Sequence, residues 1–226
     1  MKRIFEFLSQ LKTNNNREWF QANKPRFDEL HKIYADIVSQ LIDGISTFDK
    51  EITGLDAKNC IFRIYRDVRF SNDKSPYKTH FGAFITATGV RTSSGGGYYF
   101  HIEPGNSILC GGSWHPAPHI LKQLRKDIYD NIDEFIAIIE DKKFKSLYGS
   151  LEGEMLKKIP EGFPKNIPQK HADILKHKNF TLYCDKPDSF FDTENWIEKV
   201  VEEFKILYPF NKFLNYTIGE FYRKTI

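Results

Sequence analysis

The 226-residue sequence has no long apolar run, and this absence argues against a membrane-spanning helix. A bilayer span needs about 20 consecutive apolar residues, and the apolar stretches here are all much shorter. Residues 1–12 carry charges scattered among their apolar positions, which is typical of an amphipathic helix and not of a secretory signal. We therefore expect a soluble, cytoplasmic protein with no membrane partner.

Cysteine is also scarce, and its spacing excludes two further classes of site. The three cysteines, Cys60, Cys110 and Cys184, lie far apart, and no CxxC pair occurs. An odd number of separated cysteines in apolar or strand-like surroundings does not fit a disulfide framework or a zinc-binding cysteine pair. We expect reduced thiols buried in the core.

The sequence motifs of several enzyme classes are missing as well. The segment "LCGGSWHPAP" has paired glycines but neither Walker nor dinucleotide-binding spacing, and no GxSxG nucleophile motif is present. The sequence contains no internal repeat and no low-complexity segment. The cofactor and the oligomeric state therefore stay unknown at this stage, and the sequence does not decide whether the chain is an enzyme.

Net charge is small, but it is concentrated in one segment. The formal charge is +3, too low to indicate binding to nucleic acid by itself. Residues 61–80 hold five basic and two acidic side chains, whereas the other 206 residues hold 28 of each. A nucleic-acid binder should extend a basic stripe over more surface, so this distribution favours a compact site for an anionic small molecule.

Aromatic residues are abundant, and the apolar patterns indicate an α+β fold. Twenty Phe, eleven Tyr and three Trp make up 15% of the chain and supply large buried areas. The length suits one domain over residues 1–226. Apolar residues recur every three or four positions in the N-terminal part, 1–48, where Asn15 and Glu18 form a capping-box pattern and Pro25 opens a long helix.

The middle of the chain changes to a strand-like pattern. Alternation and turn residues predict a central sheet within 58–112, and the part from 116 to 226 is mostly helical, with a helix from about Thr193 that should end at Pro209. We expect an antiparallel sheet of about five or more strands with helical layers from both terminal parts. The predicted strands are 60–70, 81–88, 97–104, 106–112 and 179–185.

The basic segment 61–80, "IFRIYRDVRFSNDKSPYKTH", is the main candidate site. If 60–70 is a strand, Arg66 points to the side of Ile64 and Val68, opposite to Arg63 and its neighbours. A buried guanidinium is costly when unpaired, so Arg66 requires an acidic partner, such as one from a covering helix, or an anionic ligand.

We predict that the segment binds an anionic or phosphate-bearing molecule, because guanidinium and ammonium groups converge there. Two alternatives stay open. The cations pair with acids of the chain and the segment is a structural latch, or the same face contacts nucleic acid or an acidic protein. The predicted ligand-binding residues are Arg63, Arg66, Asp67, Arg69, Lys74, Lys78 and Trp114.

The strand 97–104 adds candidate acid/base groups. Tyr99, His101 and Glu103 share one strand face. The candidate catalytic residues are His101 and Glu103 from this strand, together with Tyr77 and His80. The alternative is a Glu103–arginine salt bridge beside a hydrogen-bonded His101.

No metal site is predicted from the sequence. His115 and His119 are four residues apart, but Pro116 and Pro118 prevent the regular helix that would align them as zinc ligands. His101, Glu103 and Asp67 give only a weak pattern of ligand types.

Two segments also resemble the signature of a known family. "FRIYRDVRFSNDKSPYKTHFGA" and "GYYFHIEPGNSILCGGSWHPAP" resemble FRIxRDxRFSxDKxPYKTxxGA and GxYxHxEPGxxxxGGGxW, found in a bacterial and fungal family of conserved proteins of unknown function. The departures are Cys110, where glycine or alanine is common, and a longer glycine loop at 95–97. The resemblance implies no established activity, so it assigns no catalytic residue.

Overall fold

A computed structural model describes residues 1–87 and 95–225 of the chain, and only the backbone beyond Gly219. The end of the predicted strand 81–88, and the residues that connect it to the glycine loop at 95–97, therefore lie outside the described residues. No helix in the described ranges is long and apolar enough to cross a membrane.

The N-terminal part is helical, as the apolar spacing predicts. Phe27, Leu30, Tyr34, Val38 and Leu41 lie along one face of the longest helix, and all are buried. The first elements are α1 (Lys2–Thr13), α2 (Arg17–Ala22), α3 (Lys24–Ser46), the 3₁₀ turn η1 (Lys50–Ile52) and the short helix α4 (Ala57–Cys60).

The start of α2 differs from the predicted capping box. Asn16 caps this helix, with its side chain accepting a hydrogen bond from the backbone N–H of Trp19. The amide of Asn15 binds the backbone of Tyr77 instead, donating to its carbonyl at 2.9 Å and accepting from its N–H at 3.1 Å. The predicted cap residue thus ties the N-terminal helices to the basic segment.

The described residues form one antiparallel sheet of four strands in the order β1-β2-β3-β4. The prediction of about five or more strands is one too many, because the first predicted strand, 60–70, is not a strand in the structure. The strands are β1 (Phe81–Ile85), β2 (Gly97–Ile102), β3 (Ser107–Ser113) and β4 (Phe180–Lys186).

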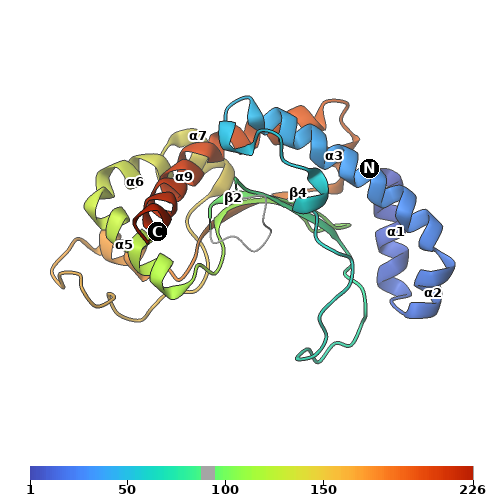
Figure 1. The fold of residues 1–226 in the computed structure, drawn as a ribbon, viewed down its shortest axis with the longest axis horizontal. Helices are drawn as coiled ribbons and strands as arrows, with labels where there is room; N and C mark the ends of the chain where they lie inside the picture. The colour runs from blue at the N-terminus through green and yellow to red at the C-terminus, as the bar shows by residue number, and fades with distance from the viewer. Residues whose placement is uncertain (88–94, 226) are drawn as a thin grey trace.

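Residues 61–80 form instead an irregular excursion that we call the hairpin loop. Its base touches the sheet at a bridge between Ile61 and Ala83, and its two arms meet at a second bridge between Tyr65 and Tyr77. Figure 1 shows the loop projecting from the side of the sheet opposite to α3. Ile64 and Tyr77 near the base of the loop are buried, whereas the residues beyond them are exposed or half-buried. A two-stranded ribbon that lacks a packed face over most of its length is marginal in water, which explains why the alternating pattern does not become a regular strand.

The C-terminal part supplies the remaining helices. The last of them passes through Pro209, so the predicted end at this proline is wrong. A proline inside a helix costs about 3 kcal/mol. Burial of Phe210, Leu214 and Ile218 beyond it contributes roughly 1.5–3 kcal/mol each, which is larger in total. These elements are α5 (Pro118–Asp130), α6 (Ile132–Ile139), α7 (Lys142–Tyr148), α8 (Gln169–Lys176), the 3₁₀ turn η2 (Asp188–Asp192) and α9 (Trp196–Thr225).

Helices α3 and α9 pack on one face of the sheet. The hydroxyl of Tyr34 in α3 donates to the carbonyl of Phe100 in β2 at 2.9 Å, and the rings of Tyr98 and Phe204 lie 5.3 Å apart. The other face, which we call the open face, carries side chains that are mostly exposed or half-buried. Strand register places them in rows, one of which runs through Phe84, Tyr99, Cys110 and Tyr183.

The cysteine prediction is confirmed for one residue only. Cys60 is buried, whereas Cys110 and Cys184 are half-buried.

Candidate functional site

Arg66, the arginine that most needs a partner, finds one inside the hairpin loop. Its guanidinium forms an ion pair with Asp73 and donates to the hydroxyl and carbonyl oxygens of Ser75 at 3.0 and 3.2 Å. The hydroxyl and the N–H of Ser75 also donate to Asp73. Together with Arg66, these bonds lower the pKa of Asp73 to about 2. The sequence requires an acidic partner or an anionic ligand for Arg66; the structure supplies an acid, which comes from the same loop and not from a covering helix.

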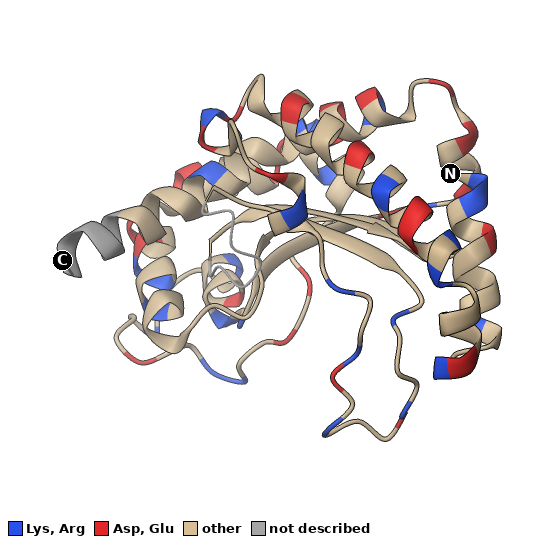
Figure 2. Cartoon of the chain, turned by 45° about the vertical axis from the view of Figure 1, so that its right-hand side comes forward, with Lys and Arg blue, Asp and Glu red and all other residues tan. Residues whose placement is uncertain are grey.

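The other cations of the loop differ in their contacts. Arg69 forms an ion pair with Asp67 at 2.6 Å, and Lys74 donates to the carbonyl of Val68 at 3.0 Å. Both acids of the loop are therefore engaged by arginines. Arg63 is exposed. Figure 2 shows basic residues along both arms of the loop.

Tyr77 is not part of the acid/base group. Its ring is buried and stacks on Phe20 of α2, with 4.0 Å between ring centroids, and its backbone is held by Asn15. The hairpin loop is thus anchored through Tyr77 to the N-terminal helices. Its next residues, Lys78, Thr79 and His80, run back to the sheet.

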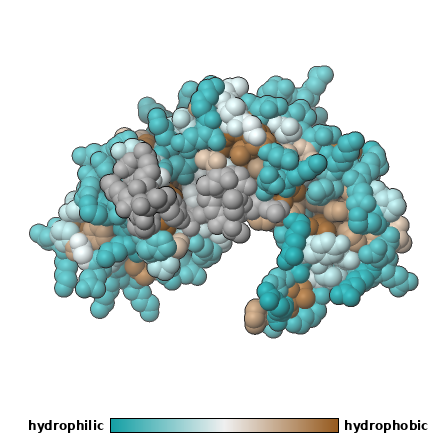
Figure 3. Space-filling view, in the orientation of Figure 1, coloured by the Kyte–Doolittle hydropathy of each residue, from teal (hydrophilic) through white to brown (hydrophobic). Residues whose placement is uncertain are grey.

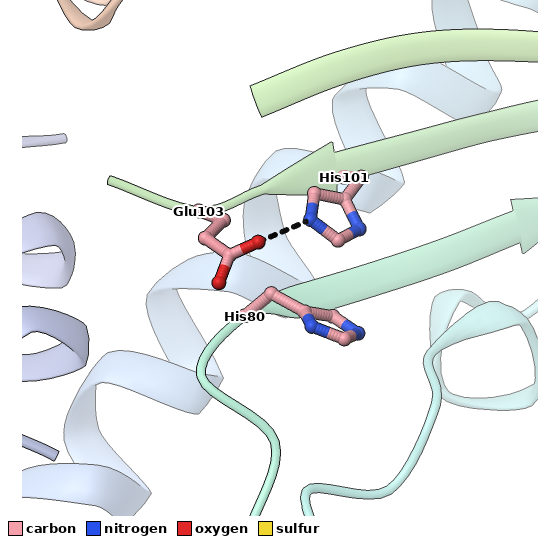
Figure 4. Close-up of side chains that lie close together, drawn as sticks. All are labelled: His80, His101 and Glu103. Carbon is pink, nitrogen blue, oxygen red and sulfur yellow. Dashed lines mark hydrogen bonds and ion pairs between the residues drawn. The ribbon is translucent and has the colours of Figure 1, made fainter. Parts of the chain in front are cut away.

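The structure does bring together His80, His101 and Glu103, which we call the His–His–Glu cluster. His101 and Glu103 follow each other on one face of β2 and its continuation, and His80 precedes β1, which pairs with β2. Phe81 is opposite Ile102, so the register brings His80 beside Glu103. Figure 4 shows the three side chains converging on the open face.

The distances within the cluster are short. His101 Nε2 lies 3.4 Å from Glu103 Oε2, and the imidazole rings of His80 and His101 stack with 4.2 Å between centroids. One nitrogen or oxygen atom from each of the three side chains lies within 4.8 Å of the others. His101 is 8% exposed, and the other two are half-buried.

Neighbouring polar groups fix the orientation of the cluster. The hydroxyl of Tyr99 lies 3.0 Å from His101 Nδ1, while Glu103 accepts hydrogen bonds from the Thr79 hydroxyl at 2.7 Å and the Asn106 amide at 2.9 Å. Gly82 makes the first of these contacts feasible, because a Cβ at this position would lie 2.7 Å from the Tyr99 hydroxyl. A glycine in β1 therefore leaves the space that Tyr99 crosses to reach His101.

Burial and hydrogen bonding set the protonation of these groups. Burial, with a smaller effect of the neighbouring His101, lowers the pKa of His80 to about 4. Burial also lowers the pKa of His101, although Glu103 opposes this effect. Burial alone would raise the pKa of Glu103, but the hydrogen bonds from Asn106, Thr79 and His101 outweigh it and lower the pKa. At neutral pH the cluster consists of two neutral imidazoles and one carboxylate.

A cation and an aromatic ring border the cluster. The ammonium of Lys78 lies 5.2 Å from the centroid of the Phe62 ring, and it is close enough to His80 to lower the pKa of that imidazole. The Phe62 ring meets the ring of Tyr99 edge to face at 6.1 Å. Figure 3 shows the molecule hollowed beside the hairpin loop, on the side of the open face.

Trp114 lies elsewhere. Register places it at the far end of β3, across from residue 95, so six strand rises separate its level from His101, roughly 20 Å. The indole is 63% exposed and touches the ring of His115. His115 precedes Pro116, and His119 lies in the first turn of α5, so neither histidine joins the cluster.

A pocket lined by α1, the turn between β2 and β3, and η2 contains none of the predicted site residues. It is mainly acidic, with two aspartates and one glutamate against one lysine, which does not suit an anion. Its lining consists of Lys2, Phe5, Glu6, Ser9, Gln10, Pro104, Asp188 and Asp192.

With this geometry in place, comparison with known proteins gives a family. Residues 3–213 match the family described as "Conserved hypothetical protein (DUF2461)". The chain belongs to this family. No curated protein and no solved structure matches the chain. The expected membership in a family of conserved proteins of unknown function is confirmed, and the family description names no activity.

Within this DUF2461 member, three contributors to the site escaped the sequence analysis. Phe62 lies in the predicted strand 60–70, Gly82 in the predicted strand 81–88, and Asn106 opens the predicted strand 106–112. Asn106 had a detectable signal, since it follows Glu103 by three residues in a turn, a spacing that brings the two side chains together. Gly82 had none, because its role depends on a tyrosine from the neighbouring strand.

Proposed function

We propose that the chain binds a small anionic molecule, carrying a phosphate or carboxylate group, on the open face beside the His–His–Glu cluster. One observation carries the proposal. Residues from two separate segments, His80 and the pair His101 and Glu103, converge in a half-buried cluster that Lys78 borders. Hydrogen bonds hold His101 and Glu103 in place, and side chains fixed in this way are suited to recognition and to proton transfer.

The charge of the hairpin loop supports an anion as the ligand. Asp67 and Asp73 form ion pairs with Arg69 and Arg66, and the loop holds three further cations, Arg63, Lys74 and Lys78. Lys78 is the one of these that borders the cluster. Its ammonium would hold the anionic group as a point charge, while the rings of Phe62 and Tyr99 supply an apolar contact for the rest of the molecule.

The proposal divides the basic segment into two roles. The tip of the hairpin loop is closed by Arg66, Asp73 and Ser75, and the loop is anchored by Tyr77. For these residues we adopt the alternative in which the segment is a structural latch. Lys78, Thr79 and His80 belong to the site. We therefore narrow the predicted ligand-binding set to the end of the segment nearest the sheet.

Thermal unfolding tests the proposal. A panel of inorganic phosphate, nucleotides and small carboxylates is screened for stabilisation of the wild type, Lys78→Ala and Lys24→Ala. Lys24 is the matched control, because its ammonium also lies over a ring, that of Phe27 at 5.3 Å, but on α3. At a hundredfold excess over Kd, a ligand stabilises the fold by about 2.7 kcal/mol, or roughly 5–10 °C in Tm.

We expect this shift in the wild type and in Lys24→Ala, and a much smaller one in Lys78→Ala. The proposal fails if no anion shifts the wild type, or if the shift is the same in Lys78→Ala.

A further inference from the structure

We infer that the His–His–Glu cluster is a binding site for a divalent transition-metal ion, held by two imidazoles and one carboxylate. Two histidines and one glutamate are the protein ligands of many catalytic zinc sites, in which a water or substrate takes the fourth position. The same donor set also suits Fe²⁺ in its two-histidine, one-carboxylate form. The shared feature is an ion with coordination positions left open toward the open face.

The geometry is close to that of an occupied site. Two ligand atoms at about 2.0–2.1 Å from a tetrahedral zinc ion lie about 3.4 Å from each other. His101 Nε2 and Glu103 Oε2 are already 3.4 Å apart, and the His80 ligand atom is within 4.8 Å of both. To reach the same separation, the His80 ligand atom has to approach each of the other two by at most about 1.4 Å, which is within the range of a side-chain rotation.

The surrounding hydrogen bonds have the form found around metal ligands. Such histidines donate their second ring N–H to an oxygen, and such carboxylates are hydrogen-bonded in turn. The hydroxyl of Tyr99 lies 3.0 Å from His101 Nδ1 and accepts its N–H when Nε2 faces an ion, since a hydroxyl both donates and accepts. Thr79 and Asn106 hold Glu103. Gly82 keeps open the path of Tyr99.

A metal ion also resolves a conflict of charge at this site. An anion bound directly against the carboxylate of Glu103 would be repelled by it. A divalent ion reverses the local charge from −1 to +1 and accepts an anionic oxygen in an open position. This last step rests on the proposed function, whereas the metal site itself rests on the ligand atoms and their hydrogen bonds.

Metal binding is measured without any organic ligand. Protein stripped with a chelator is titrated with Zn²⁺ by calorimetry and with Co²⁺ by visible absorption, and Mn²⁺ and anaerobic Fe²⁺ are compared for selectivity. The variants are His80→Ala, Glu103→Gln and Thr79→Val, with His119→Ala as the control at a histidine outside the cluster. His101 is left unchanged because it is buried.

We expect one equivalent of Zn²⁺ in the wild type and in His119→Ala, and d–d bands with Co²⁺ typical of four or five ligands. Loss of outer partners weakens metal sites by about 10–100-fold, so Thr79→Val falls in this range and His80→Ala and Glu103→Gln lose at least as much. The inference is overturned if the wild type binds no stoichiometric metal. It is also overturned if His80→Ala and Glu103→Gln, with unchanged circular dichroism, bind the metal with the same affinity as the wild type. Retention of the anion-induced thermal shift in stripped protein would then leave the proposed function standing.

Discussion

At the scale of single residues, the hairpin loop and the cluster are organised by carboxylates with several partners each. Glu103 accepts from Thr79 and Asn106, and Asp73 is bound by Arg66 and Ser75. A carboxylate with two or three donors is stabilised in its charged form, which lowers its pKa. These residues therefore hold local structure without contributing to a hydrophobic core.

Asp73 gives a direct test at this scale. We predict a carboxyl pKa of about 2 in the folded chain, below the ordinary value of about 3.9. Because the charged form is the bound one, the stability that Asp73 gives the loop is full above about pH 4 and declines as the pH falls toward about 2. A carbon-detected NMR titration measures the pKa.

Ser75→Ala and Arg66→Ala should each raise this pKa, because each removes a hydrogen bond to the carboxylate. Arg3→Ala, which removes a guanidinium from an exposed pair with Glu29, should leave it unchanged. A wild-type midpoint near the ordinary value would show that the closed tip of the loop does not persist in solution.

At the scale of elements, the packing of α9 on β3 depends on a missing side chain. A Cβ at Gly111 would lie 1.9 Å from Leu207 Cδ2, so the close approach of helix and strand requires glycine. Leu207 is fully buried in the resulting contact. The face of the sheet that bears the cluster is left open because both long helices, α3 and α9, pack on the opposite side.

We predict a strong coupling between these two positions. Gly111→Ala should destabilise the chain by about 1–3 kcal/mol through overpacking, and Leu207→Ala by about 2–5 kcal/mol through the cavity it leaves. The double variant should be less destabilised than the sum by at least about 1 kcal/mol, because the added methyl fills part of the cavity. Chemical denaturation measures all three.

Gly111→Ala combined with Leu30→Ala is the matched control, since Leu30 is a buried leucine of α3. The effects of that pair should add within about 0.5 kcal/mol. Additive behaviour of Gly111 and Leu207 would contradict the described contact between helix and strand.

Elements with their own periodic pattern were the predictable part of the fold. The stripe of α3 and the alternation of β2 identify both the elements and their buried faces, because one face of each packs on the other. The segment 60–70 has a similar alternation, but within the described residues only Ile61 and Phe62 pair with a strand of the sheet. Farther along, its pairing is limited to the bridge between Tyr65 and Tyr77 and the hydrogen bonds beside it. A local pattern cannot report the absence of such a neighbour. The continuation of α9 through Pro209 was not predictable either, because it depends on the burial of residues beyond the proline, which a local pattern does not report.

The cluster was predictable only in part. The shared face of Tyr99, His101 and Glu103 follows from strand alternation alone. That His80 joins them, and that Tyr77 and Trp114 do not, depends on strand register and on the path of the hairpin loop. Those are long-range features.

At the scale of the whole molecule, charge is distributed evenly except on the hairpin loop. Figure 2 shows acidic and basic residues intermixed over the helices, and the pairs Lys126 with Asp130 and Lys145 with Glu140 are examples. No basic stripe extends from the loop across the helical part of the described chain in this view.

The tip of the hairpin loop carries Phe70, which is 95% exposed.

We predict that the chain does not bind nucleic acid appreciably. Fluorescence anisotropy with short single-stranded and double-stranded DNA and RNA should show no saturable binding at about 0.15 M salt, since few phosphates can be neutralised. Saturable binding that weakens steeply as salt increases, and that is lost in Arg63→Ala or Lys74→Ala, would support the nucleic-acid alternative instead.

The central claim is that the open face at the His–His–Glu cluster is where this chain meets its ligand. The most direct measurement is a nitrogen-15 spectrum of the histidine imidazoles, recorded while the anion with the largest thermal shift is added. We predict that the signals of His80 and His101 move with saturation, that those of His115, His119 and His171 do not, and that Lys78→Ala weakens the response. Unchanged His80 and His101 signals at saturation, or changes confined to the other histidines, would contradict the account.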